Sequence, residues 1–186
     1  CITVTDSRFS KNSDPEKAAE TYVALGVGYL DSGDIVLARK KIERALKIAP
    51  ESASAHSAMA MYWNERGELK LAEKEFEHAL ELNEGHSPTN YHYGRFILQN
   101  KRTPRSCELL SAAATDVDYN ARVPAYEDLG ICYMAFNDSS KAIDAFEKAW
   151  SLDLNSTISA LHLTELYLQR KSFRPAKRWF ERFEEI

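Results

Sequence analysis

The chain has 186 residues, of which 44% are hydrophobic and 28% charged, and it carries a formal net charge of −4 at pH 7. This size and composition indicate one soluble domain or a repeat array with a real core. Acidic and basic residues are interleaved, so nucleic acid is not an expected partner. No run approaches the roughly 18 apolar residues of a membrane-spanning helix, and three cysteines are too few for a disulfide scaffold.

The chain begins with the polar stretch CITVTDSRFSKNSDPEKAAE, which has neither an initiator Met nor an apolar segment. It shows no helical periodicity before about Ala18, so it is neither a signal peptide nor part of a core. We expect residues 1–18 to form a flexible tether, from which an upstream segment has been removed.

A pattern of small and large residues then recurs with a period of about 34 residues. In each unit a small residue such as Gly26 or Ala60 allows close approach of two helices, and a large residue such as Tyr29 fills the space between helix pairs. Gly33 and Gly67 fall at the expected turns. The pattern predicts five units over residues 19–52, 53–86, 87–122, 123–156 and 157–186.

This spacing resembles the tetratricopeptide repeat, a helix–turn–helix unit. The resemblance implies an all-α fold, a right-handed solenoid of antiparallel helix hairpins. The third unit contains the extra residues TDVDYNARVP, which predict a longer connection before the fourth. The fifth stops within its second helix, and since a solenoid needs a polar terminal element, we expect the natural chain to continue beyond Ile186.

The sequence offers little support for catalysis. It contains no glycine-rich phosphate loop and no nucleophile elbow, so we expect neither an enzyme nor a cofactor. His86 and His92 are not spaced to place two ligands on one helical face, and no metal site is expected. His56 occupies a core position of the repeat and is interpreted as a packed imidazole.

A repeat array of this kind offers a concave surface formed by the first helix of each pair. The expected groove is unusually apolar, which indicates either a site for an apolar or amphipathic peptide or side chains that pack against neighbouring helices. Its predicted partner-binding residues are Val23, Val27, Leu30, Met61, Asn64, Tyr91, Arg95, Leu98, Ile131 and Met134. In the fifth unit, Leu161, Glu165 and Leu168 occupy the same register.

An N-terminal Cys, a polar tether and the segments NYHYGRFILQNKR and YEDLGICYMAFNDSSKAIDAFEKAWSLD together resemble the PilF/PilW pilotin family. These are type IV pilus biogenesis lipoproteins built of about six such repeats. The resemblance implies a lipid-anchored protein on the periplasmic face of the outer membrane that helps the pilus secretin to assemble. The alternative is a generic repeat scaffold in another cell-envelope complex.

The same resemblance implies that Cys1 carries the lipid anchor, the alternative being a sequence boundary that happens to fall on a cysteine. Three acyl chains hold a protein to a membrane stably, whereas one holds it marginally. Ile2 lacks the acidic character of an inner-membrane retention signal, which favours the outer membrane. In an oxidising periplasm Cys107 and Cys132 form either a disulfide or two buried thiols.

Overall fold

The structure is a computed structural model that describes residues 15–186, and this part of the chain is entirely helical, without a strand. The helices are α1 (Pro15–Asp31), α2 (Ile35–Ile48), α3 (Ala53–Glu65), α4 (Leu69–Leu82), α5 (Ser87–Asn100), α6 (Arg105–Thr115), α7 (Arg122–Ala135), α8 (Ser139–Leu152), α9 (Thr157–Gln169) and α10 (Phe173–Glu184). The predicted all-α class is confirmed. Within residues 15–186, no helix combines the length and the apolar character that crossing a membrane requires.

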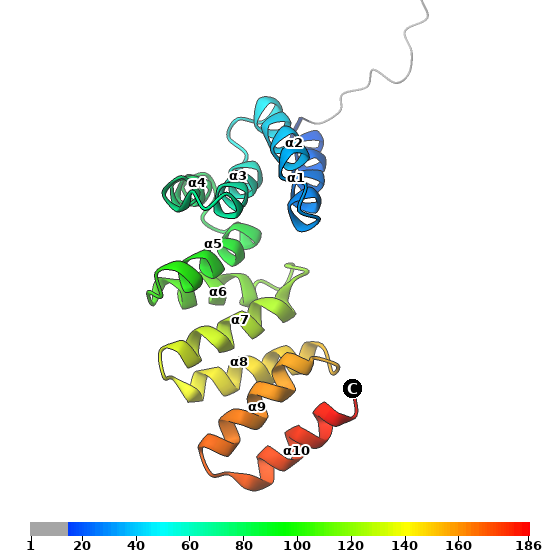
Figure 1. The fold of residues 1–186 in the computed structure, drawn as a ribbon, viewed down its shortest axis with the longest axis vertical. Coiled ribbons are helices and arrows are strands. Elements are labelled where there is room, and N and C mark those ends of the chain that lie inside the picture. Colours follow the sequence, from blue (N-terminus) through cyan, green and yellow to red (C-terminus); the bar gives the residue numbers. More distant parts are fainter. Residues whose placement is uncertain (1–14) are drawn as a thin grey trace, which may run out of the picture. The chain divides into compact units, whose positions relative to one another are not determined.

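The chain divides between Glu84 and Gly85 into two compact units, each of which is described by itself. In the N-terminal unit, α1 packs against both α2 and α3, and α3 pairs with α4. Figure 1 shows α1 and α2 lying side by side as one hairpin. The first two predicted repeats therefore each form a helical hairpin.

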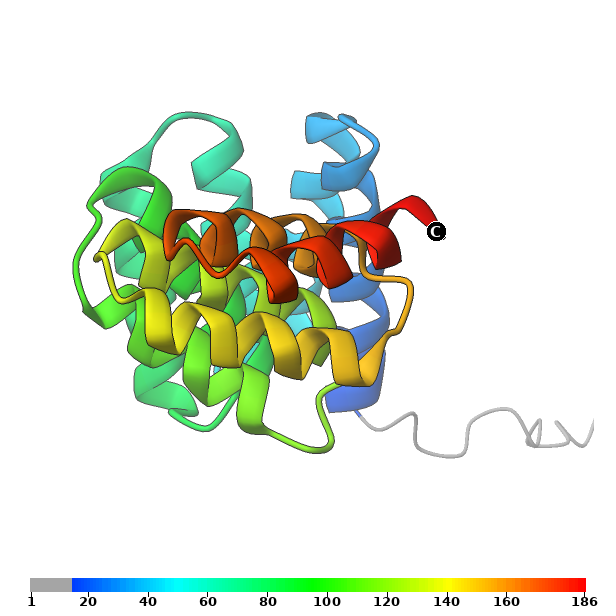
Figure 2. The same cartoon turned by 90° about the horizontal axis from the view of Figure 1, so that it is seen from below.

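The C-terminal unit contains three further hairpins, α5–α6, α7–α8 and α9–α10. Successive hairpins are joined by the packing of α6 on α7 and of α8 on α9. Figure 2 shows the α9–α10 hairpin lying against the α7–α8 hairpin. Each hairpin buries an apolar face that it could not bury alone, which is how a repeat array builds a continuous core.

The hairpin turns explain why the helices end where they do. Gly33 and Gly67 have φ angles of 79° and 74°, a left-handed conformation that glycine adopts without steric cost. Asp34 then caps α2, its side chain accepting a hydrogen bond from the Leu37 amide at 3.0 Å. Asp138 caps α8 in the same way.

The predicted longer connection lies between α6 and α7, over residues 116–121. Its start is fixed by Asp116, which accepts hydrogen bonds from the Ser87 hydroxyl and from the Asp118 amide. Its end is fixed by Arg122, whose Nε donates to the Ala114 carbonyl at 3.1 Å. The extra residues therefore form an ordered loop that is tied to α5 through Ser87, and Arg122 joins the start of α7 to the end of α6.

The start of α1 corrects one predicted boundary. The helix begins at Pro15, not after residue 18. Proline suits the first turn of a helix because its missing amide hydrogen is not needed there, and Glu16 favours the positive end of the helix dipole. This first turn carries no apolar stripe, so periodicity alone missed it.

Candidate functional site

The predicted groove residues of the N-terminal unit lie on α1 and α3, around one hydrophobic cluster. Val23, Val27 and Met61 are partly buried and pack against this cluster. Asn64 is also partly exposed. Leu30 is only 7% exposed and belongs to the core itself. The expectation that Leu30 faces a partner is therefore wrong, because its side chain fills the space beneath the α1–α3 surface.

The predicted residues of the C-terminal unit divide in the same way. Arg95, Leu98 and Met134 are partly exposed, and Ile131 is 36% exposed. Tyr91 is only 8% exposed and belongs to the hydrophobic core, so its ring offers little area to a partner. This is a second correction to the predicted surface.

A polar cluster lies between the first helices α5 and α7. Arg95 Nε lies 3.1 Å from Asp128 Oδ2, and both side chains are partly exposed. The Arg95 guanidinium also lies 5.4 Å from the centroid of the Tyr91 ring. Tyr91 and Asp128 share a side-chain hydrogen bond, so Tyr91 helps to hold the Asp128 carboxylate in position beside Arg95.

The longer connection contributes Tyr119 to this cluster, with its ring 6.1 Å from that of Tyr91. Burial raises the pKa of the Tyr119 hydroxyl to about 12. Burial is the main cause that raises the pKa of Tyr91 well above its usual range, and the negative charge of the nearby Asp128 carboxylate adds to it. Burial also raises the pKa of Asp128, while Arg95 opposes this shift. The cluster is a partly exposed ion pair whose Asp128 carboxylate lies beside two neutral phenols.

Sequence reasoning missed Asp128 and Tyr119. Asp128 precedes the small Gly130 of the fourth repeat and resembles any exposed acid of an amphipathic helix. Tyr119 lies in the connection, to which a helical period assigns no face. The inserted loop itself was the available signal, because long loops in compact arrays commonly carry functional residues.

The two histidines weighed as metal ligands have other roles. His86 caps α5, its Nδ1 accepting a hydrogen bond from the Thr89 amide at 3.3 Å. His92 lies on α5, and burial, assisted by the positive charge of Arg95, lowers its pKa to about 4. Residues 15–186 contain no group of three or more His, Cys, Asp or Glu side chains that could hold a metal ion.

The interpretation of His56 as a packed imidazole is confirmed. Its Nδ1 lies 2.7 Å from Glu75 Oε2, and its Nε2 lies 2.9 Å from the Pro50 carbonyl oxygen. The His78 ring packs against it edge-on, with centroids 4.5 Å apart. The hydrogen bond with Glu75 raises the pKa of His56, against the effect of burial.

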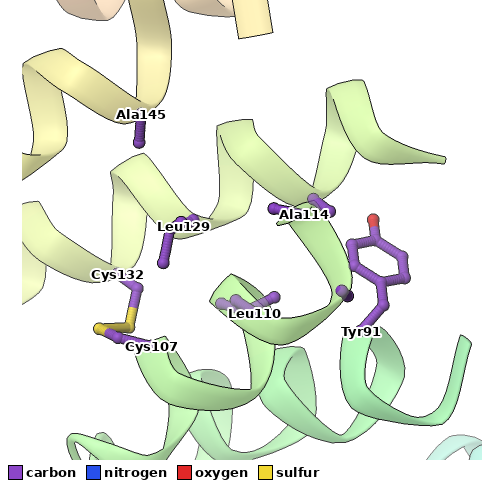
Figure 3. Packing of buried hydrophobic residues seen from close by; sticks show 9 residues of the cluster. Tyr91, Cys107, Leu110, Ala114, Leu129, Cys132 and Ala145 are labelled. Carbon is purple, nitrogen blue, oxygen red and sulfur yellow. A yellow bond between two sulfur atoms is a disulfide. The ribbon is translucent and has the colours of Figure 1, made fainter. Parts of the chain in front are cut away.

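The structure joins Cys107 of α6 to Cys132 of α7 by a disulfide, the first of the two alternatives. Their Cα atoms are 5.6 Å apart, within the range that a bridge requires. Figure 3 shows the bridge at one edge of the core, near Leu110 and Leu129. It covalently links the second helix of the third repeat to the first helix of the fourth.

Exposed apolar side chains continue along the first helices of the last two repeats. Ile131 on α7 is 36% exposed, and Leu161 and Leu168 on α9 are 41% and 49% exposed. The first helices of the C-terminal unit thus carry both exposed apolar side chains and the Arg95–Asp128 ion pair. Such side chains suit an amphipathic peptide with both apolar and polar groups.

Comparisons with known proteins are consistent with this geometry. The family model of a tetratricopeptide repeat matches residues 123–156, the range predicted for the fourth repeat. The type IV pilus assembly protein PilF of Pseudomonas aeruginosa is 30% identical over 184 residues, covering 98% of this chain and 73% of that protein. The chain belongs to the PilF/PilW family.

Solved structures of the PilF/PilW family share the fold. The structure of Pseudomonas aeruginosa PilF matches with a TM-score of 0.84 and 30% identity, covering 92% of this chain and 77% of that chain. PilW, a widely conserved type IV pilus biogenesis factor, matches with a TM-score of 0.75 and 20% identity, covering 90% of this chain and 76% of the PilW chain. MamA of Desulfovibrio magneticus RS-1 has a TM-score of 0.72 at 21% identity, covering 90% of this chain and 94% of the MamA chain. This likeness shows the fold alone.

Proposed function

We propose that this protein is a non-enzymatic assembly factor, or pilotin, for the outer-membrane secretin of a type IV pilus. The observation that carries the proposal is the 30% identity with PilF across 98% of the chain. That relative is named as a type IV pilus assembly protein, and PilW as a pilus biogenesis factor. The secretin as partner follows from the resemblance to pilotins, which deliver such multimers to the membrane.

The proposal includes a lipid anchor at Cys1, on the periplasmic face of the outer membrane. Cys1 lies outside the residues that the structure describes, so the support is the sequence: an N-terminal Cys followed by Ile2 and a polar stretch. Three acyl chains would hold the protein stably at the membrane. The helical repeats that begin at Pro15 would then be presented to the secretin close to its site of assembly.

The proposed docking surface comprises the partly exposed residues of the first helices. In the N-terminal unit these are Val23, Val27, Met61 and Asn64, with Met61 offering a flexible, polarisable contact. Because Leu30 and Tyr91 are core residues, substitutions there would destabilise the fold and could not report on binding. Met61→Glu is the sharper variant, since Glu forms helix well and its charge would be desolvated further when a partner binds. Because Met61 packs partly against the hydrophobic cluster, a thermal melt checks that the variant keeps its fold.

The location and the partner are tested together by replacing Cys1 with Ser in the natural precursor. The Ser variant should move from the outer membrane to the periplasmic fraction, and its thermal unfolding should match that of the wild type. The pull-down of secretin by solubilised wild-type protein and by Met61→Glu is the companion measurement, with Met61→Leu as the matched control.

We expect Met61→Leu to retain secretin and Met61→Glu to lose most of it. Continued outer-membrane fractionation of the Cys1→Ser variant would contradict the lipid anchor. Absence of secretin from the wild-type pull-down, with other envelope proteins in its place, would favour the generic scaffold instead.

A further inference from the structure

The second helix of the first repeat, α2, is strongly basic in a chain whose net charge is −4. Lys40, Lys41, Arg44 and Lys47 lie along it and are here called the basic face. The equivalent helix of the second repeat, α4, carries Glu73, Glu75, Glu77 and Glu81 against two lysines. The basic charge of α2 is therefore not shared by α4, and among the second helices α10 is also basic, with four cations against two glutamates.

The basic face lines a surface cavity of about 320 Å³ together with Tyr22 and Glu43. Glu43 is paired with Arg39, whose Nε lies 2.8 Å from Glu43 Oε1, so the carboxylate is compensated by a cation outside the cavity. Lys41 Nζ lies 5.9 Å from the centroid of the Tyr22 ring. The cavity thus concentrates positive charge beside an amphipathic aromatic ring.

An exposed apolar side chain accompanies this charge. Val36 is 80% exposed, although it lies in the first turn of α2. Residues four apart share a helix face, which places Val36 on the same face as Lys40 and Arg44. Basic residues on a helix with an adjacent apolar side chain are typical of a surface that rests on a membrane interface.

We propose that the basic face of α2 docks on anionic phospholipid headgroups, with Val36 entering the interface. Three of its four cations are lysines, which act as mobile point charges and lack the planar fork by which arginine recognises one fixed carboxylate. This favours fluid phosphate headgroups over an acidic protein segment. The inference rests on the proposed function for its setting, since the tether at Cys1 would bring α2 to the membrane.

The test is flotation of the full chain, made without acylation, with vesicles of phosphatidylcholine alone or mixed equally with phosphatidylglycerol. The basic-face variant replaces Lys40, Lys41, Arg44 and Lys47 with Gln. The matched control removes the same number of charges elsewhere, by changing the exposed residues Lys70, Lys74, Lys148 and Lys177 to Gln. Circular dichroism verifies that both variants keep their helices.

Each basic residue near an anionic surface contributes about fivefold to binding, so the variant without four of them should bind the mixed vesicles about 600-fold more weakly. The control should lose less than tenfold, and salt should weaken wild-type binding. The inference is overturned if wild-type protein binds the two vesicle types equally or if both variants lose binding equally. Because no lipid anchor is present, this outcome is independent of the fate of the Cys1→Ser variant in cells.

Discussion

The two units build the same hairpin with different turn residues. In the N-terminal unit, Gly33 and Gly67 supply the left-handed residue of the turn. In the C-terminal unit, Arg102, Asn137 and Lys171 adopt φ angles of 48°, 60° and 56° at the corresponding places. The packing of the two helices therefore dictates the turn, and the residue at that position only sets its cost.

The units also differ in how they hold their interiors together. The C-terminal unit contains the Cys107–Cys132 disulfide and the partly exposed Arg95–Asp128 ion pair, both of which link neighbouring repeats. The N-terminal unit is held by apolar packing around Ile42 and by the His56–Glu75 hydrogen bond. Four changes should separate these contributions.

The largest effect is expected from opening the disulfide. The bridge closes a loop with a sequence separation of 25, and a loop of this size corresponds to about 3 kcal/mol of unfolding free energy in the chain-entropy model. Reduction, or the Cys107→Ala and Cys132→Ala double variant, should destabilise α6 and α7 selectively. Hydrogen exchange resolved along the chain measures this, with α1–α4 as the internal control. Equal loss of protection in both units would show that they unfold as one.

Acid should act on the two units in opposite directions. His92 has its folded pKa lowered to about 4, below the usual value near 6.5, so the unfolded chain takes up the proton first. The free energy of unfolding is therefore unaffected by His92 above about pH 6.5, and it falls by on the order of 3 kcal/mol as the pH drops towards 4. His56 has its folded pKa raised, so its contribution is complete below about pH 6.5 and is lost as pH rises through the folded pKa.

The titration of both imidazoles by NMR checks these directions. The His92 signal should titrate near pH 4 and the His56 signal above its ordinary value. Urea unfolding of His92→Gln should show a weaker loss of stability between pH 6.5 and 4 than the wild type. A His92 signal that titrates near 6.5 would contradict the buried, neutral imidazole.

Adding a side chain where paired helices approach closely should destabilise both units. A Cβ atom on Gly130 would lie 2.6 Å from the rigid Phe146 ring, so Gly130→Ala should cost about 2 kcal/mol through overpacking. A Cβ on Gly26 would meet Ile42 Cγ1 at the same distance, and this buried β-branched side chain has one preferred χ1 rotamer in a helix, so we expect a similar cost. Gly28→Ala is the control, since nothing lies within 4 Å and a better helix former should stabilise by up to about 1 kcal/mol. Thermal unfolding ranks the three.

The smallest effect concerns the turns themselves. Lys171→Gly should stabilise the C-terminal unit by about 0.5 to 1 kcal/mol, because it removes the steric cost of a left-handed lysine. Gly67→Ala should destabilise the N-terminal unit by about 1 kcal/mol for the opposite reason. Urea midpoints of the two single variants suffice, and the same sign for both would refute the account of the turns.

The repeat pattern predicted the fold because it encodes local sterics. Gly33, Gly67 and the small residues of each first helix recur at a fixed spacing, and the helices formed where that spacing placed them. The start of α1 at Pro15 was not predicted, because its first turn is stabilised by backbone and dipole effects and has no apolar stripe. Turns built on Arg102 or Lys171 have no sequence signature, since only the packed hairpin imposes their conformation.

The candidate site was harder to predict than the fold. A helical period assigns a face, but it does not say how deeply a side chain is buried once neighbouring helices pack beside it. Leu30 and Tyr91 share the register of Val27 and Arg95, yet the contacts between α1 and α3 and between α5 and α7 cover them. The partnership of Arg95 with Asp128 joins different repeats and depends on that packing as well.

We propose that this member of the PilF/PilW family promotes assembly of the pilus secretin. The most direct measurement is the amount of secretin multimer in outer membranes of a strain that lacks the gene, complemented with wild-type protein or with Cys1→Ser. We expect abundant multimers with the wild type and few with the Cys1→Ser variant, at equal levels of secretin monomer. Undiminished multimers in the uncomplemented strain would contradict it.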